Sequence, residues 1–290
     1  MELNDFLFPS PKFNPQNISP YINEILLIPK PNSPFPYIPT LYLPFIPTTA
    51  KSSYISHCSS SLLILFHSNG EDLISSRIFA NKLRIQLQIN ILIVEYPGYS
   101  LYNTSKNCET VLEDTLIVYD YILTKIPNVN VSNIYIIGRS IGTAPAIYLS
   151  SKRKVGMLFL ISPFTSIKAV AGNMFGFLKL FVSERFVNGN YIQDVKCPVL
   201  FIHGYKDKMI PYNETLLLKD KLNGIYEVCI QSNMTHNKFN VESDIIQPIK
   251  EFIERNAGKR EEDVNEGMWI TMMESLCGKG CDIEKLIKGS

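Results

Sequence analysis

The chain has 290 residues and a formal net charge of +1; 46% of its residues are hydrophobic and 19% are charged. One larger α/β domain fills such a length and buries roughly three quarters of the surface of its unfolded chain. The near-neutral charge argues against a nucleic-acid-binding protein, which depends on a basic surface. Composition and charge therefore leave two classes of protein open, an enzyme or a protein-binding domain.

The N-terminal segment, residues 1–57, is rich in proline. Two apolar runs of strand length, Ile22–Ile28 and Ile38–Phe45, lie between its prolines. Because proline donates no hydrogen bond to a β-ladder, we expect both runs to be edge strands of a sheet. A disordered linker is the alternative, although the many large apolar side chains argue against it.

Residues 58–257 are expected to form the core of the fold, because apolar runs of strand length alternate there with segments of helical period. Continuous apolar runs indicate strands buried on both faces. Their alternation with helices predicts an α/β fold with a mostly parallel central sheet and helices on both faces. The expected strands are Leu62–Phe66, Ile89–Val94, Ile134–Ile137, Met157–Ile161, Val199–Ile202 and Tyr226–Ile230. The expected helices are Asp72–Leu87, which begins near Asp72 as N-cap, Thr110–Lys125, Ile141–Lys152, Thr215–Leu222 and Ser243–Arg255.

The stretch from Pro163 to Pro198 does not follow this alternation. It carries an apolar, helix-like cluster near the edge of the sheet at which α/β proteins bind their ligands. We interpret the cluster as a short helical lid or as the wall of an acyl pocket, with an ordinary core helix as the alternative. Its predicted pocket residues are Met174, Phe175, Phe177, Leu178 and Phe181.

The two ends of the chain were inspected for signals that indicate where in the cell the protein is located. The N-terminus lacks a basic segment followed by an apolar run, and no stretch is apolar for the length of a membrane span. Residues 258–290 begin with a charged run and are expected to be an extension on the surface. We therefore expect a cytoplasmic protein.

A candidate nucleophile lies in Gly138-Arg139-Ser140-Ile141-Gly142, which matches G-x-S-x-G. The pentapeptide alone is a weak signal. Here it follows a predicted strand directly and precedes a helix of small residues, which is the context of a nucleophile elbow. Such a turn exposes the serine hydroxyl at the N-terminus of a helix, and flanking glycines let the neighbouring backbone pass closely. We predict that Ser140 is the nucleophile.

A serine hydroxyl needs a base that removes its proton. The chain has four histidines. His57 is expected at the surface, and His67 and His203 each end a buried strand, where they orient loops. His236 lies in a loop between the last strand and the last helix, the position of the base in hydrolases of this order. A surface histidine in a polar loop is the alternative for His236.

The base in turn needs a carboxylate that holds its tautomer. Asp207 follows the strand Val199–Ile202 and reaches the same edge of the sheet, whereas no acid follows Met157–Ile161. For the oxyanion, the backbone N–H of Ile141 is the first predicted donor. The second is expected from the loop after the first core strand, at Asn69.

Together these segments resemble the α/β-hydrolase superfamily and, within it, the group of α/β hydrolase domain-containing protein 17. That resemblance runs from about Leu62 to Arg255 and implies the α/β-hydrolase fold and a membrane-associated thioesterase that removes palmitate from protein cysteines. It rests on Phe66-His67-Ser68-Asn69-Gly70-Glu71-Asp72, Glu95-Tyr96-Pro97-Gly98-Tyr99-Ser100, Gly138–Thr143, Ser162-Pro163-Phe164-Thr165-Ser166 and Cys197–Asp207.

The chain departs from that group at three places. It has His67-Ser68-Asn69 where the group has His-Gly-Asn, and Thr235-His236-Asn237 where the group has Gly-His-Asn. Animal members carry a lipidated, cysteine-rich N-terminus, but the first 57 residues here contain no cysteine. Peripheral attachment to membranes is therefore left open rather than carried over.

We thus expect a serine hydrolase that cleaves an ester or thioester, in an acylated protein or a small molecule, through an acyl-enzyme. This chemistry needs no cofactor and no metal. An aminopeptidase-like hydrolase and a non-catalytic binding protein of the same fold are the alternatives. The first would require acidic residues that hold a free amine, and the second would be favoured by the loss of a triad residue.

Overall fold

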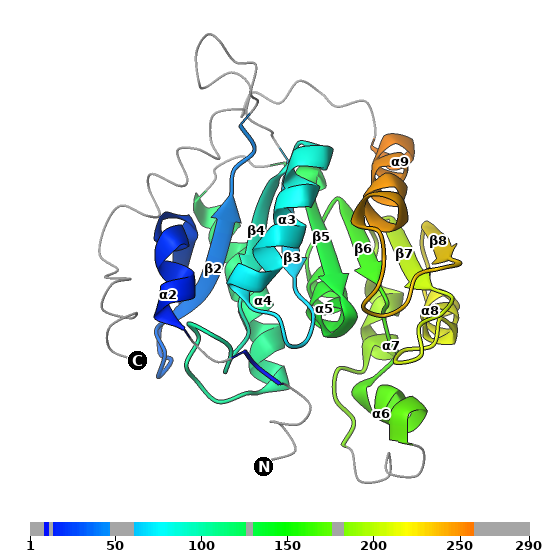
Figure 1. Cartoon of the computed structure of the whole chain (residues 1–290), viewed down its shortest axis with the longest axis horizontal. Coiled ribbons are helices and arrows are strands. Elements are labelled where there is room, and N and C mark those ends of the chain that lie inside the picture. The colour runs from blue at the N-terminus through cyan, green and yellow to red at the C-terminus, as the bar shows by residue number, and fades with distance from the viewer. Residues whose placement is uncertain (1–8, 12–13, 47–60, 126–129, 176–182, 258–290) are drawn as a thin grey trace. The chain divides into compact units, whose positions relative to one another are not determined.

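The computed structural model describes residues 9–11, 14–46, 61–125, 130–175 and 183–257 (Figure 1). They divide into two compact units, one up to Asn133 and the other from Ile134 on. The predicted extension, residues 258–290, lies outside the described residues.

The first unit contains four strands in the order β1-β2-β4-β3. β1 pairs antiparallel with β2, β2 antiparallel with β4, and β4 parallel with β3. In Figure 1, α3 is drawn in front of these strands and α4 behind them. The strands are β1 (Ile25–Pro29), β2 (Tyr37–Leu43), β3 (Leu62–Phe66) and β4 (Asn90–Val94). The helices are α2 (Pro15–Ile18), the 3₁₀-helix η1 (Ser19–Glu24), α3 (Leu73–Leu87), α4 (Cys108–Lys125) and the 3₁₀-helix η2 (Val131–Asn133).

Of the two strands expected at an edge, only β1 lies there, because β2 pairs on both sides. Pro39 is tolerated inside β2 for a geometric reason. The β2–β4 ladder starts at the pair Thr40 and Val94, one residue after Pro39. The Pro39 carbonyl still accepts a hydrogen bond from the Glu95 N–H at 3.1 Å, so the missing N–H interrupts no rung of the ladder.

The start of α3 is determined locally, as expected. The Asp72 side chain accepts a hydrogen bond from the Ser75 N–H at 2.8 Å, and the Ser75 hydroxyl accepts one from the Asp72 N–H at 2.8 Å. This capping box satisfies two N–H groups that the first turn of a helix leaves free. The helix ends before Gln88, which has the left-handed conformation with φ 53°.

The second unit contains four parallel strands in the order β5-β6-β7-β8. All of β6 and β7 is buried, which requires cover on both faces, whereas β8 is only partly buried. The strands are β5 (Ile134–Arg139), β6 (Met157–Ile161), β7 (Val199–Gly204) and β8 (Tyr226–Gln231). The helices are η3 (Ser140–Gly142), α5 (Thr143–Lys152), α6 (Ile167–Phe175), α7 (Asn188–Tyr191), η5 (Ile192–Asp194), α8 (Asn213–Lys219), the π-helix η6 (Val241–Ile246) and α9 (Gln247–Asn256).

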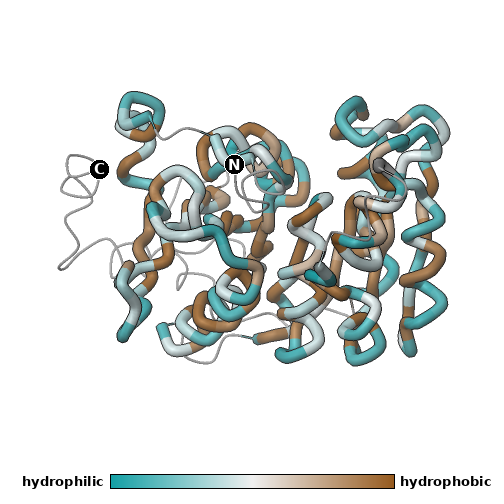
Figure 2. Tube along the Cα trace, turned by 90° about the horizontal axis from the view of Figure 1, so that it is seen from below, coloured by the Kyte–Doolittle hydropathy of each residue, from teal (hydrophilic) through white to brown (hydrophobic). Residues whose placement is uncertain are grey.

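The hydropathy of the residues along the chain agrees with helices that pack on the strands. The helices in Figure 2 alternate hydrophobic and hydrophilic segments along the tube, as helices that pack by one face do. The predicted α/β architecture, with a mostly parallel arrangement of strands and helices packed on them, is confirmed. Within the described ranges, no helix combines the length and the apolar character that crossing a bilayer requires.

Candidate active site

The predicted elbow connects β5 to α5 through one turn of 3₁₀-helix, η3. Ser140 has φ 53°, the left-handed conformation that strains a residue with a Cβ atom, and its carbonyl accepts a hydrogen bond from the Thr143 hydroxyl at 2.7 Å. A Cβ atom at Gly138 would lie 2.3 Å from the Gly142 oxygen and 2.7 Å from the Thr143 Cα. Only glycine at position 138 therefore lets the helix start so close to the strand.

The structure brings together the three predicted triad side chains, all within the second unit. The Ser140 hydroxyl lies 3.0 Å from Nε2 of His236, and Nδ1 of His236 lies 2.7 Å from Oδ2 of Asp207. In the neutral imidazole, Nδ1–H donates to Asp207 and Nε2 accepts the Ser140 proton. This is the geometry of a nucleophile, a base and the group that orients the base.

Asp207 is held as a charged, oriented carboxylate. Its Oδ1 accepts hydrogen bonds from the N–H groups of Met209 and Ile210, both at 2.9 Å. Burial by itself raises the pKa of Asp207, but His203, His236 and the Ile210 N–H outweigh burial and lower the pKa well below its usual range. Asp207 therefore stays ionised at neutral pH.

His203 contacts Asp207 on the side away from His236, and its two ring nitrogens have partners other than the Ser140 hydroxyl. Its Nδ1 lies 2.8 Å from the Thr215 hydroxyl, and its Nε2 lies 2.8 Å from the Ile210 carbonyl and 3.6 Å from Oδ2 of Asp207. A carbonyl can only accept, so Nε2 carries the proton, which also faces the carboxylate at longer range. Both ring nitrogens are thereby used, as expected of a histidine that orients a loop.

The loop that carries His236 is tied to two strand ends. A Cβ atom at Gly204, the last residue of β7, would lie 2.3 Å from the Met234 oxygen, so the loop passes directly over this glycine. Arg139, the last residue of β5, donates a hydrogen bond from Nη2 to the His236 carbonyl at 3.1 Å, and its guanidinium lies 5.0 Å from the centre of the Phe239 ring. Sequence reasoning missed Arg139, because the second position of G-x-S-x-G is variable and nothing local indicates its partner.

The two predicted oxyanion donors lie in different units. Ile141 follows Ser140 in η3, so its N–H belongs to the elbow itself. Asn69 follows β3 in the first unit, where its Oδ1 accepts a hydrogen bond from the Tyr99 hydroxyl at 2.6 Å. The assignment of both donors stays a prediction.

The predicted lid coincides in part with α6, which ends with Met174 and Phe175. Phe177, Leu178 and Phe181 lie outside the described residues. The base of this segment is held by Glu214, a buried carboxylate of α8 that sequence reasoning also missed. Glu214 accepts hydrogen bonds from the N–H and hydroxyl of Thr165, at 2.8 and 2.6 Å, and from the Asn173 amide at 3.2 Å.

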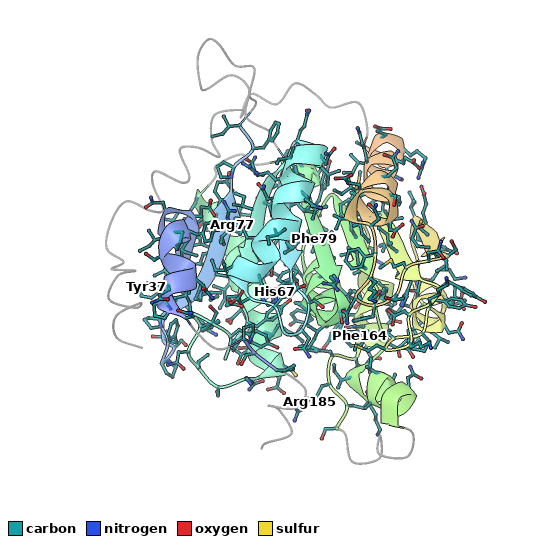
Figure 3. The ribbon with its side chains drawn as sticks, viewed as in Figure 1. Tyr37, His67, Arg77, Phe79, Phe164 and Arg185 are labelled. Atoms are coloured by element: carbon teal, nitrogen blue, oxygen red, sulfur yellow. The ribbon has the colours of Figure 1, made fainter. Side chains whose placement is uncertain are left out.

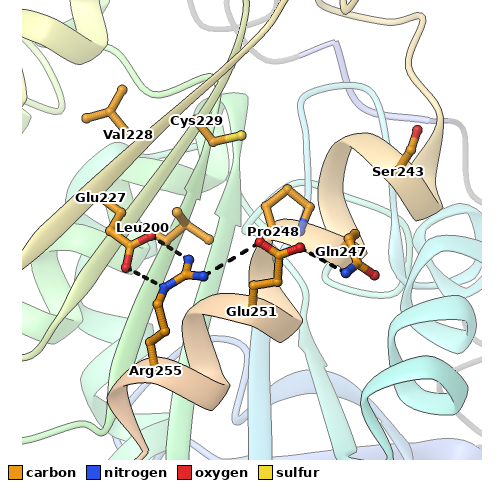
Figure 4. Close-up of a pocket in the computed structure, with 9 residues that line it drawn as sticks. All are labelled: Leu200, Glu227, Val228, Cys229, Ser243, Gln247, Pro248, Glu251 and Arg255. Carbon is orange, nitrogen blue, oxygen red and sulfur yellow. Dashed lines mark hydrogen bonds and ion pairs between the residues drawn. The ribbon is translucent and has the colours of Figure 1, made fainter.

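A groove of about 350 Å³ between β8 and α9 does not belong to this site, because no triad residue lines it (Figure 4). Its polar side chains satisfy one another. Arg255 donates to both carboxylate oxygens of Glu227, at 3.1 and 2.6 Å, and pairs with Glu251 at 3.6 Å, while Gln247 donates to Glu251 at 2.9 Å. The groove therefore offers no free charged group to a ligand.

Among curated proteins, the human α/β hydrolase domain-containing protein 17B is 26% identical over 216 residues, which cover 72% of this chain and 74% of the human protein. The α/β hydrolase domain-containing protein aho-3 of Caenorhabditis elegans is 25% identical over 195 residues, 67% of this chain. The chain spans 58% of the length of that nematode protein. No protein-family model matches the chain.

Solved structures show the same fold. The Pyrococcus furiosus esterase Pf2001 superposes with a TM-score of 0.63 at 14% identity, over 86% of this chain and 95% of the esterase. Est1E from Butyrivibrio proteoclasticus, solved with bound ferulic acid, superposes with a TM-score of 0.60 at 15% identity, over 81% of this chain and all of Est1E. The chain therefore has the fold of the α/β-hydrolase superfamily and is similar, within it, to the group of α/β hydrolase domain-containing protein 17.

Proposed function

We propose that the chain is a serine hydrolase that cleaves a carboxylic ester or thioester through an acyl-enzyme on Ser140. The observation that carries the proposal is the continuous hydrogen-bonded path from Ser140 through His236 to Asp207, at 3.0 and 2.7 Å, at the end of parallel strands. The likeness to α/β hydrolase domain-containing proteins and to esterase folds supports a hydrolase.

In the first half of the reaction, Ser140 Oγ attacks the substrate carbonyl while His236 Nε2 takes the hydroxyl proton. Asp207 stabilises the imidazolium that forms and keeps its ring in place. The tetrahedral intermediate collapses when His236 returns the proton to the departing alcohol or thiol. The acyl group then remains on Ser140 as an ester.

In the second half, a water molecule attacks the acyl-Ser140 carbonyl and His236 accepts its proton. The intermediate collapses to a carboxylic acid and free Ser140, so the balance is one water consumed for each ester cleaved. In both halves the oxyanion is stabilised by main-chain N–H groups, of which we assign the first to Ile141, the residue after the nucleophile. Neither half requires a metal or an organic cofactor.

The finer proposal concerns the substrate. The resemblance to the group of α/β hydrolase domain-containing protein 17 supports a fatty acyl thioester on a protein cysteine, with the acyl chain lying along the apolar segment that begins in α6. Met174 and Phe175, and with them Phe177, Leu178 and Phe181, are our candidates for the acyl pocket. An aminopeptidase-like hydrolase differs in cleaving an amide next to a free amine.

The test of the proposed function is covalent labelling of the purified chain by a fluorophosphonate probe. We expect labelling of the wild type and its loss in Ser140→Ala and His236→Ala, because only the activated serine reacts. Ser151→Ala is the matched control, since its hydroxyl only donates to the Tyr148 carbonyl within α5, at 2.7 Å. A folded wild type that stays unlabelled would favour a non-catalytic binding protein.

Substrate class is tested on the same preparations with p-nitrophenyl esters and acyl thioesters of graded chain length, and with aminoacyl p-nitroanilides. The thioester proposal predicts faster turnover of long acyl thioesters than of short ones. Turnover of the anilides alone would establish the aminopeptidase-like alternative.

A further inference from the structure

The connection between β6 and β7 leaves the sheet and returns to it through two backbone legs, which we call the neck. The outgoing leg, residues 162–167, leads from β6 into α6, and the return leg, residues 185–189, leads into α7. Figure 3 labels one residue of each leg, Phe164 and Arg185, and Figure 1 draws α6 beyond the ends of the strands of the second unit. The position of α6 therefore depends on how the neck is held.

The outgoing leg begins beside the candidate nucleophile. Ile161, the last residue of β6, pairs in register with Arg139, the residue before Ser140. Because the two strands are parallel, the neck starts at the same edge of the sheet as the elbow.

Hydrogen bonds join the two legs, each to a main-chain carbonyl of the outgoing or the return leg. The Ile167 N–H donates to the Arg185 carbonyl at 3.0 Å, the Gly189 N–H to the Thr165 carbonyl at 3.3 Å, and the Asn188 amide to the Phe164 carbonyl at 2.8 Å. Asn188 is fully buried, so separating the legs would leave buried polar groups without partners.

Each leg also contains a residue in the left-handed conformation. Ser162 has φ 50° and Phe186 has φ 46°, and neither is a glycine. Such strain persists only where the surrounding structure leaves the backbone no alternative. The neck is therefore a fixed base for α6.

Glu214 joins this base to α8. Its Oε2 accepts hydrogen bonds from the N–H and the hydroxyl of Thr165, at 2.8 and 2.6 Å, and its Oε1 accepts one from the Asn173 amide, in α6, at 3.2 Å. The side chain is buried, and hydrogen bonds to a charged acceptor are stronger than those to a neutral one. One carboxylate thus holds both the neck and the helix that follows it.

The next residue of α8 reaches the surroundings of the triad. The Thr215 hydroxyl lies 2.8 Å from Nδ1 of His203, and Nε2 of His203 lies 3.6 Å from Oδ2 of Asp207. Consecutive residues of one helix therefore contact the neck and the histidine beside the triad carboxylate. All of these links lie within the second unit.

We infer that Glu214 is a specificity-determining residue that, through the neck, sets the position of α6 and thereby the length of acyl chain that the hydrolase accepts. The inference rests on the proposed function, because it takes α6 as the start of the acyl pocket. Glu214 touches no reacting atom and acts as a positioning residue. A shifted α6 loses contacts with the distant carbons of a long acyl chain, whereas a short chain does not extend to them.

The test compares the hydrolysis of p-nitrophenyl decanoate with that of p-nitrophenyl butyrate. We expect Glu214→Ala to lower kcat/KM about tenfold for the decanoate and about twofold or less for the butyrate. The loss corresponds to contacts with about two methylene groups, since each buried methylene strengthens binding about fourfold. Glu214→Gln should recover most of the selectivity, because its amide oxygen can accept both bonds from Thr165.

Asp114→Ala is the matched control. Asp114 is also a buried carboxylate and accepts hydrogen bonds from two side chains, Lys30 and Tyr102, neither of which belongs to the neck. A loss of folded protein lowers the rates with both esters alike, so Asp114→Ala should keep the wild-type ratio of decanoate to butyrate hydrolysis.

The outcomes separate the inference from the proposed function. If the wild type neither reacts with fluorophosphonate nor hydrolyses either ester, the proposed function fails. If the wild type hydrolyses both esters and Glu214→Ala keeps the wild-type ratio, the inference fails and the proposed function stands. Hydrolysis of the butyrate alone by the wild type would also overturn the inference, because no pocket for a long acyl chain would be present.

A second variant covers the case in which Glu214→Ala does not fold. Asn173 is exposed, and Asn173→Ala removes the bond from α6 to Glu214 while the bonds from Thr165 remain. The ratio of decanoate to butyrate hydrolysis should fall in this variant too, by about threefold. An unchanged ratio in Asn173→Ala would show that Glu214 does not set the position of α6.

Discussion

Gly138 and Ser140 together make a turn that few residues can occupy. Ser140 takes the left-handed conformation, and Gly138 leaves room for the Gly142 carbonyl. The strain at Ser140 is maintained because the buried strand β5 before it and the buried turn after it leave the backbone no alternative.

We predict that Gly138→Ala destabilises the protein by about 3 kcal/mol or more, because the new Cβ would meet backbone atoms that cannot move without shifting the helix. Chemical denaturation followed by circular dichroism measures the change. Gly224→Ala is the control, since the nearest atom to its new Cβ lies at 3.8 Å, an ordinary contact. Equal stability losses in the two variants would contradict the steric explanation.

Among single residues, the sequence indicated those whose role can be predicted from the residues next to them in the chain. The elbow and the N-cap Asp72 follow from neighbours a few residues away, and Asp207 and His236 were predicted from their places directly after expected strands. Arg139 and Glu214 could not be predicted, because each acts on a partner about 100 or 50 residues distant: His236 for Arg139 and Thr165 for Glu214. A charged side chain in a turn or at a helix start is ordinarily a solvated surface residue.

Between elements, Arg139 links the end of β5 to the loop after β8, which carries His236. It contacts the main chain of His236 and not the imidazole, so its role is to position the loop. Its guanidinium fork also faces Oδ1 of Asn237 at 3.4 Å.

We predict that Arg139→Ala lowers kcat about tenfold with little change in KM, because a loop displaced by a fraction of an ångström weakens the transfer of the Ser140 proton. Steady-state hydrolysis of p-nitrophenyl butyrate measures kcat and KM separately. Arg153→Ala, at the end of α5, serves as control and should retain wild-type kinetics. An unchanged kcat in Arg139→Ala would show that Gly204 and Met234 hold the loop without it.

The bounds of elements with a strong hydrophobic pattern of their own were predicted closely. Features that depend on neighbouring strands or helices were not. The strand Met157–Ile161 was predicted with the bounds that the structure has. The helix expected over Ser243–Arg255 instead begins two residues earlier, as the π-helix η6. The position of β2 inside its sheet could not be predicted, because proline counts against an interior strand unless the end of the neighbouring ladder is known.

For the molecule as a whole, we expect stability to depend on pH through the buried pair of His67 and Glu95, whose Nε2 and Oε1 atoms lie 3.0 Å apart. The pKa of His67 in the folded state is raised above its ordinary value of 6.5. The ion pair therefore contributes its full stabilisation below pH 6.5, and the contribution is lost as the pH rises through the folded-state pKa. Glu71, Tyr96 and Tyr99 are the other titratable groups that face this pair.

We predict that the midpoint of urea unfolding falls as the pH rises from 6 toward 9, and that it falls less in the double variant His67→Gln with Glu95→Gln. The double variant keeps hydrogen-bonding groups of similar size but has no charge to lose. Parallel pH dependences in the two proteins would show that other groups, such as the thiols, are responsible.

The general architecture could be predicted because apolar runs such as Leu62–Phe66 and Val199–Ile202 follow the pattern of strands buried on both faces. Side-chain networks such as His67 with Glu95 could not, since the charge of a histidine depends on acceptors that only the folded chain supplies.

The candidate triad also has a place in the order of folding. His236 lies 29 residues after Asp207 and 96 after Ser140, so the three meet only when β5, β7 and β8 have found their partners. Contacts of such long range form late, because the chain between them must first lose its freedom. In a refolding experiment, the return of serine reactivity therefore marks completion of the second unit rather than collapse of the chain.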